Sequence, residues 1–152
     1  MPLQEGNMAP DFSLLDQDGK VIKLSNYLGK PVVLYFYPKD DTPGCTTEAC
    51  NFRDDYPNYD QAGVVILGVS PDTPKKHTKF REKYNLPFTL LADEAHEVCE
   101  LYQVWGRKKF MGREYDGVFR TTYLIDAKGK IVKVFENVKP DGHSAQVLAA
   151  LK

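Results

Sequence analysis

The residue of this sequence best suited to covalent chemistry is Cys45, which follows the continuously apolar run Val32–Phe36. Thr42 followed by Pro43 has the form of a helix N-cap and a first helical residue, which would place Gly44 and Cys45 in the first turn. Unpaired N–H groups and the positive end of the helix dipole at that position favour a thiolate over a thiol. Cys45 is therefore a candidate nucleophile at neutral pH.

A second cysteine, Cys50, lies on the same expected helix. In an unbroken helix it would sit about 140° around the axis and about 7.5 Å along it from Cys45. A disulfide needs Cα atoms within about 7 Å, so joining the two would require the first turns to unwind. Gly44 and the Thr46–Thr47 pair are poorer helix formers than alanine and lower that cost by about 1–2 kcal/mol. Taken alone, these residues leave open that both cysteines are small buried hydrophobes.

Length and composition restrict the class of protein. A chain of 152 residues has room for one domain, and we expect a single domain over residues 1–152. Hydrophobic residues make 42% and charged residues 27% of the chain, which is typical of a soluble globular protein and excludes a disordered tail or a fibre. An odd count of three cysteines argues against a disulfide framework and leaves redox, metal-binding or buried-thiol roles.

Charge and hydropathy restrict the partners. The chain has 20 basic and 21 acidic residues, so the basic excess that drives nucleic-acid binding is missing. No apolar run approaches the roughly 20 residues that span a bilayer. The first residues lack the positive and apolar regions of a secretory signal. We therefore expect a cytoplasmic protein without a nucleic-acid or membrane partner.

The hydrophobic pattern predicts an open, mixed α/β sheet. We expect strands at 11–15, 20–24, 32–36, 64–69, 88–92, 121–125 and 131–135, and helices at 46–56, 74–84, 93–102 and 144–151. The first two strands form an N-terminal hairpin, and residues 32–69 form a β-α-β unit with parallel strands. Residues 105–119 suit a surface hairpin or loop. Cys45 would then follow the carboxyl end of a core strand, where such sheets place their ligands.

One motif carries a family resemblance. The pattern Pro38-x-x-x-Thr42-x-x-Cys45 resembles the peroxidatic motif of the peroxiredoxins, which are thiol peroxidases of thioredoxin-like fold. Residues 43–54 are similar to the bacterioferritin comigratory protein, or Q-type, branch, and the likeness extends to residues 9–12, 68–70 and 120–126. The resemblance implies an α/β thioredoxin-like fold, with a mixed central sheet flanked by helices. It also implies a cofactor-free peroxidase that reduces hydrogen peroxide and organic hydroperoxides.

The resemblance assigns a role to each residue of the motif. Cys45 would attack the peroxide, Thr42 and Arg120 would orient it, and Pro38 would shield the pocket. A guanidinium near the departing oxygen stabilises the charge that develops there. The sulfenic acid on Cys45 would condense with Cys50 to an intramolecular disulfide, which a thioredoxin-like donor would reduce. Because that disulfide needs no second chain, we expect a monomer.

Two further residues belong to the expected pocket. Gly44 directly precedes the nucleophile, and Glu48 follows it by one turn. An unpaired Glu48 would oppose thiolate formation, so we expect it to engage a cation such as Arg120. Simpler interpretations remain for two of the assigned residues: Thr42 only caps a helix, or Arg120 only pairs with surface acids.

The remaining chemical features have plainer interpretations. His96 and Cys99 could share a helix face as half a zinc site, but a structural site needs about four ligands, so we expect Cys99 to be a packed residue. No Cys-x-x-Cys motif suggests an ordinary thioredoxin, and no glycine-rich run suggests a nucleotide. Residues 107–109 are basic and are interpreted as a solvated loop face.

Two functions from different classes therefore compete. The first is a peroxidase that uses Cys45 and Cys50. The second is a redox-switched binding module, in which the same disulfide remodels a surface without significant turnover. Catalytic consumption of peroxide would distinguish the first from the second.

Overall fold

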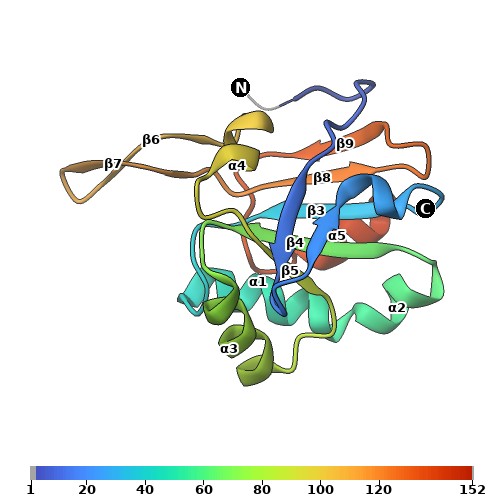
Figure 1. Cartoon of the computed structure of the whole chain (residues 1–152), viewed down its shortest axis with the longest axis horizontal. Coiled ribbons are helices and arrows are strands. Elements are labelled where there is room, and N and C mark those ends of the chain that lie inside the picture. Colours follow the sequence, from blue (N-terminus) through green and yellow to red (C-terminus); the bar gives the residue numbers. More distant parts are fainter. Residues whose placement is uncertain (1–2, 152) are drawn as a thin grey trace.

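The computed structural model describes residues 3–151 as a seven-stranded mixed sheet with a separate two-stranded hairpin (Figure 1). The strands are β1 Ser13–Asp16, β2 Val21–Lys23, β3 Val32–Phe36, β4 Val65–Ser70, β5 Thr89–Ala92, β6 Trp105–Phe110, β7 Arg113–Val118, β8 Thr121–Ile125 and β9 Ile131–Phe135. The helices are α1 Pro43–Asp54, α2 Tyr56–Gln61, α3 Pro74–Tyr84, α4 Glu97–Leu101 and α5 His143–Ala150, with a 3₁₀ turn at Leu24–Tyr27. The main sheet has the order β2-β1-β5-β4-β3-β8-β9.

The expected β-α-β unit forms the centre of the sheet. Strand β3 is buried at every position, as its continuously apolar sequence predicts for a central strand. It pairs in parallel with β4 and antiparallel with β8. The N-terminal hairpin is also confirmed, with β1 and β2 antiparallel and the carboxylate of Asp16 accepting the amides of Asp18 and Lys20 across the turn.

Each face of the sheet carries its own apolar core. The face that includes Val33 and Tyr35 packs against α1, α2, α3 and α5. The opposite face, which includes Leu34 and Phe36, packs against α4 and the N-terminal segment. This division follows from the alternation of side chains along β3. Cys45 lies in the first core and Cys99 in the second, so the sheet separates them.

Some predicted boundaries are wrong. Helix α1 begins at Pro43, three residues before the expected Thr46, and α2 and the 3₁₀ turn were not predicted. Helix α4 begins at Glu97 and not at Asp93, because His96 adopts the left-handed conformation with φ 48°. The Asp93 carboxylate still satisfies the first turn, since it accepts the amides of Val98 and Cys99.

The hairpin β6–β7 extends away from the main sheet (Figure 1). The expectation of a surface hairpin over residues 105–119 is thus confirmed. Its end leads directly into β8, so the hairpin and the start of β8 form one continuous segment. None of the helices among residues 3–151 has the length and apolar composition that a bilayer crossing requires.

The antiparallel pairing of β8 decides which residues meet at one edge of the sheet. Thr121, the first residue of β8, is the register partner of Phe36, the last residue of β3. Arg120 therefore arrives at the same edge as the loop that leaves β3 toward α1, although 75 residues separate it from Cys45. The order of the strands thus brings two residues that are far apart in the sequence together at the candidate site.

Candidate active site

Cys45 occupies the first turn of α1, as its sequence context predicts. Thr42 has the extended backbone of an N-cap (φ −99°, ψ 155°), and Pro43 is the first helical residue. The first helical hydrogen bond runs from the amide of Thr46 to the carbonyl of Thr42, at 2.8 Å. The amides of Gly44 and Cys45 therefore precede the helical ladder, and they provide the positive end of α1 at the sulfur.

The decisive contact of the site is made by Arg120. Its Nη2 donates to Sγ of Cys45 at 3.3 Å, and its Nη1 donates to Oε1 of Glu48 at 2.7 Å. Cys45 is only 1% exposed and Glu48 is fully buried. Burial alone would lower the pKa of Arg120, but the negative charges of Glu48 and Cys45 outweigh it and raise that pKa. The guanidinium therefore stays cationic beside the sulfur.

Glu48 engages Arg120 as expected, but in a more buried setting than the sequence suggests. Burial raises the pKa of Glu48 to about 7, and the charge and hydrogen bond of Arg120 act in the opposite direction. Oε2 of Glu48 and the hydroxyl of Tyr35 are the two buried side-chain atoms among residues 3–151 that have no hydrogen-bond partner. Burial, followed by the charges of Glu48 and Cys45, raises the pKa of Tyr35 well above its usual value. A titratable carboxyl thus lies one helical turn from the nucleophile.

The other predicted pocket residues lie in the loop before α1 and in its first turn. The Thr42 hydroxyl donates to the carbonyl of Lys39 at 2.9 Å and does not cap α1, which excludes a capping role for that side chain. Its oxygen keeps lone pairs that can accept a hydrogen bond. Pro38 is half-buried in the same loop. At Gly44 an added Cβ would lie 3.2 Å from Nη2 of Arg120, so the absent side chain leaves room for the guanidinium.

Cys50 lies on the same unbroken helix and is half-buried. All three cysteines are free thiols in this structure. The intact helix keeps Cys45 and Cys50 on different faces, because five residues correspond to about 140° of rotation. The neighbouring Asn51 donates to the carbonyl of Pro140 at 2.9 Å, which ties the middle of α1 to the segment before α5. A disulfide between the two cysteines therefore requires local unwinding, as expected from the spacing.

Cys99 and His96 lie in different surroundings. Cys99 is a packed residue with no exposed surface, and burial raises the pKa of its thiol. His96 is half-buried and stacks on Trp105 with ring centroids 4.1 Å apart, so it does not share a site with Cys99. Within residues 3–151 the one group of three close metal-ligand side chains is Asp40, Asp72 and His77. The zinc alternative at His96 and Cys99 is thus not supported.

One cation near the site, Lys108, was not predicted from the sequence. Lys108 was assigned to a solvated loop face, but it is half-buried and donates to the carbonyl of Val118 at 2.8 Å. Burial, and then the positive charge of Arg120, lower the pKa of Lys108. The signal that would have found it is the alternation of the hairpin, which directs Lys108 away from the solvated side chains of Arg107 and Lys109.

Comparison with known proteins identifies the family. The profile of the AhpC/TSA family matches residues 6–134. The chain is 51% identical over 152 residues to Peroxiredoxin Bcp of Bacillus subtilis, covering 100% of this chain and 97% of that protein. It is 52% identical over 151 residues to Peroxiredoxin Bcp of Escherichia coli, covering 99% and 97%. The chain is a peroxiredoxin of the AhpC/TSA family.

Solved structures of other peroxiredoxins agree with this assignment. The bacterioferritin comigratory protein of Xanthomonas campestris superposes with a TM-score of 0.87 at 38% identity, covering 92% of this chain and 89% of that one. A PrxQ mutant of Xylella fastidiosa superposes with a TM-score of 0.94 at 32% identity, covering 99% and 96%. The thioredoxin-like fold expected from the sequence is thereby confirmed. As a peroxiredoxin the protein is a thiol-dependent peroxidase, and the family thus favours the enzyme over the binding module without turnover.

The first prediction concerns the space at Gly44. In Gly44→Ala the new methyl would press against Nη2 of Arg120 and displace the guanidinium by a few tenths of an ångström. We expect kcat/KM for hydroperoxide to fall by about tenfold, because small misplacements in an active site are costly. Alanine is the better helix former, so the free energy of unfolding in urea should not decrease. The matched control is Thr47→Ala, an exposed position on α1, and equal kcat/KM values for the two variants would contradict this role of Gly44.

The second prediction concerns the titration of Glu48. Its folded-state pKa of about 7 lies above the ordinary value of 4.5, so its protonation stabilises the fold at low pH and this contribution is lost as the pH rises through about 7. Glu48→Gln cannot ionise. We expect the free energy of unfolding of the unsubstituted protein to decrease, relative to that of Glu48→Gln, between about pH 5 and about pH 8. Urea titrations of both proteins at the two pH values measure the difference, and a constant difference would refute the assignment.

Proposed function

We propose that Cys45 is the peroxidatic cysteine of this peroxiredoxin, and the contact from Nη2 of Arg120 to its Sγ carries the proposal. The Cys45 thiolate attacks one oxygen of the hydroperoxide R–O–O–H. An S–O bond forms and the O–O bond breaks, which leaves a sulfenic acid on Cys45. The departing R–O⁻ takes up a proton and leaves as an alcohol, or as water when R is hydrogen.

The surrounding residues supply the charge stabilisation and orientation that this step needs. Negative charge moves from the sulfur to the departing oxygen, and the guanidinium of Arg120 is placed to stabilise it along that path. The Thr42 hydroxyl, whose proton is directed to Lys39, offers its oxygen to the O–H of the peroxide. Glu48 acts through Arg120, which it holds at 2.7 Å, and Pro38 shields the pocket. Gly44 has no side chain to press on that guanidinium and lines the substrate pocket beside it.

Cys50 is proposed as the resolving cysteine. Its thiolate attacks the sulfenic sulfur of Cys45, an S–S bond forms, and hydroxide leaves and is protonated to water. Gly44 and the two threonines that follow Cys45 reduce the cost of unwinding the first turns of α1. Formation of the disulfide and the change of conformation are therefore one coupled step.

The substrates and the reductant follow from the same chemistry. The structure of the Xanthomonas campestris relative was determined in connection with its alkyl peroxide reduction activity, and we propose that this chain reduces alkyl hydroperoxides as well as hydrogen peroxide. A thioredoxin-like dithiol would return the disulfide to two thiols by exchange and become oxidised itself. Because the proposed disulfide joins cysteines of one chain, we propose that the enzyme works as a monomer, in the reducing cytoplasm.

Replacement of single cysteines tests these roles. In Cys45→Ser, peroxide consumption with a thioredoxin system should fall by about three orders of magnitude or more, because the hydroxyl is a far weaker nucleophile. Cys50→Ser should accept one oxidation per chain and then stall as a sulfenic acid. Cys99→Ala is the matched control, since its sulfur lies across the sheet, and it should retain turnover.

Mass mapping of the peroxide-treated protein identifies the product directly. The expected product is a disulfide between Cys45 and Cys50 within one chain. A disulfide that includes Cys99, a link between two chains, or unchanged steady turnover of Cys50→Ser would remove Cys50 from the resolving role.

A further inference from the structure

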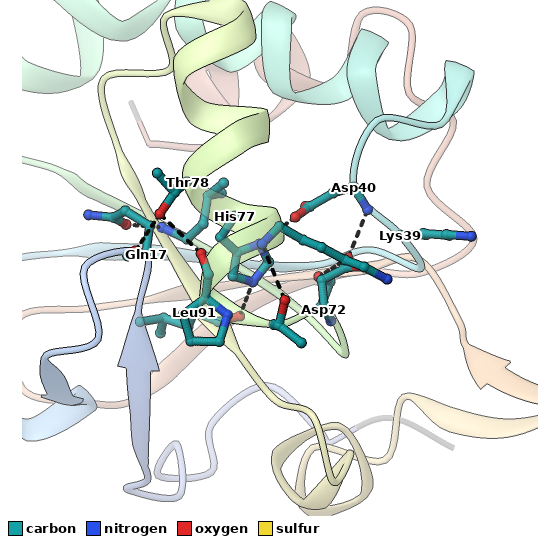
Figure 2. A network of polar contacts seen from close by, with 12 residues as sticks. Gln17, Lys39, Asp40, Asp72, His77, Thr78 and Leu91 are labelled. Atoms are coloured by element: carbon teal, nitrogen blue, oxygen red, sulfur yellow. Dashed lines mark hydrogen bonds and ion pairs between the residues drawn. The ribbon is translucent and has the colours of Figure 1, made fainter.

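The loop that connects β3 to α1 is held by a buried polar network around Asp40 (Figure 2). This β3–α1 loop comprises residues 37–42. Oδ1 of Asp40 accepts the Tyr37 hydroxyl at 2.5 Å, and its Oδ2 lies 2.6 Å from Nδ1 of His77. The amide of Asp40 donates to Oδ2 of Asp72 at 2.8 Å, and the Ser70 hydroxyl donates to the same oxygen at 2.6 Å. Asp72, in the connection between β4 and α3, thus fixes the backbone of Asp40, and His77 of α3 fixes its carboxylate.

The contact between Asp40 and His77 holds a single proton. Nε2 of His77 faces the carbonyl of Leu91 at 2.9 Å, and a carbonyl only accepts, so Nε2 must carry a hydrogen. One more proton lies between Nδ1 of His77 and Oδ2 of Asp40. Whichever atom carries it, the pair as a whole is neutral, and the His77 side chain is completely buried. A neutral, hydrogen-bonded pair is the arrangement in which burial of these two groups is tolerated.

A metal ion does not explain the same cluster. Two ligands of one tetrahedral ion each lie about 2.0–2.2 Å from it and therefore about 3.3–3.6 Å from one another. The 2.6 Å contact between Asp40 and His77 is a hydrogen bond, and the second nitrogen of His77 is occupied by Leu91. The structure therefore favours a positioning role for the cluster over a metal site.

Helix α3 also holds the next loop residue, Asp41. Its Oδ2 accepts from Nζ of Lys83 at 2.8 Å, and its Oδ1 accepts the Tyr84 hydroxyl at 2.8 Å. Asp41 adopts the left-handed conformation with φ 58°, which an aspartate tolerates better than most residues. Two consecutive residues of the β3–α1 loop are thus bound to α3, immediately before the helix that carries Cys45.

The far end of α1 contacts the same helix. Nη1 of Arg53 donates to the carbonyl of Tyr84, the last residue of α3, at 2.9 Å. The segment between Asp41 and Arg53 is therefore bounded on both sides by contacts with α3. Cys45 and Cys50 both lie inside it, and so do the poor helix formers Gly44 and Thr46.

We propose that Asp40 and His77 are positioning residues of the peroxidase reaction, which hold the β3–α1 loop to α3 so that Thr42 and Cys45 meet the peroxide in a fixed arrangement. Unwinding of α1 during disulfide formation is then confined to the segment between Asp41 and Arg53. The inference rests on the roles proposed for Cys45 and Cys50. Neither Asp40 nor His77 touches the substrate, so both act through the backbone of the loop.

Two replacements of His77 test its hydrogen bonds to Asp40 and to Leu91 separately. The amide of asparagine can take the place of Nδ1 and keep a hydrogen bond to Asp40, whereas that of glutamine matches Nε2 and keeps only the one to Leu91. In His77→Gln we expect the second-order rate of Cys45 oxidation by hydrogen peroxide to fall by about tenfold or more. The subsequent rate of disulfide formation should be unchanged or higher, because the loop is looser. His77→Asn should retain more of the oxidation rate than His77→Gln.

Stopped-flow oxidation and acid-quench mass analysis measure the two rates separately. They are recorded below the thermal midpoint of every variant. His96→Gln, on the far side of the sheet from Cys45, is the control for loss of an imidazole. A His77→Gln protein in which both rates stay within about twofold of the unsubstituted protein would overturn the proposal. So would an equal decrease of both rates, or a His77→Asn protein as slow as His77→Gln.

Amide hydrogen exchange of the unsubstituted protein provides a test that needs no variant to fold. In the reduced protein the amide of Asp40 should be protected, and after oxidation protection should be lost within residues 43–52 while Asp40 keeps it. Rapid exchange of Asp40 in the reduced protein, or opening that extends from α1 through Asp40 on oxidation, would contradict the proposal. The measurement on the reduced protein involves no peroxide, so it examines the loop independently of the roles proposed for the cysteines.

Discussion

The site depends on one half-buried guanidinium that faces two acidic groups. Arg120 donates through one nitrogen to Cys45 and through another to Glu48. Its charge offsets the repulsion between the two acidic groups, and they offset the cost of burying the cation. A carboxylate one turn from a thiolate would repel it, and an isolated buried arginine would be costly. With the cation between them, the site can hold negative charge on the sulfur without leaving an unpaired positive charge. The remaining unpaired oxygen of Glu48 shows that this balance is incomplete.

This arrangement requires that strand and helix ends meet at one edge of the sheet. Strand β3 delivers the loop to α1, and the antiparallel strand β8 begins where β3 ends. The positive end of α1 and the cation before β8 are thereby directed at the same sulfur. Neither contribution is unusual alone, but their convergence places Cys45 in a buried and electropositive position, which is typical of reactive cysteines.

Helix α1 must satisfy two opposed requirements. In the proposed mechanism its first turn has to be rigid when peroxide is attacked, since the sulfur, the guanidinium and Thr42 would act together. The same turn has to unwind if Cys50 is to reach Cys45, because an intact helix holds the two cysteines apart. Contacts with α3 on both sides of the segment, at Asp41 and at Arg53, offer a physical solution. They bound the segment that has to change, while Asp41 and Arg53 on either side of it keep their place.

The sequence by itself determined the features that depend on neighbouring residues. Strand β3 follows from its run of apolar β-branched and aromatic residues, α3 from Thr73 and Pro74 at its start, and the first turn of α1 from Thr42 and Pro43. The spacing of Cys45 and Cys50 also showed that a disulfide needs unwinding. These inferences hold because the hydrogen bonds and the side-chain alternation within one segment depend only on the residues of that segment.

Only the tertiary structure decided what meets across the chain. The predicted start of α4 was wrong because His96 is left-handed, and Asp93 accepts amides five and six residues later instead of starting the helix. The partial burial of Lys108 depends on the path of the hairpin. The pair of Asp40 and His77 had no signal in the sequence, since 37 residues separate two common polar side chains. Such contacts are set by how strands are ordered in the sheet, and no local pattern of residues records that order.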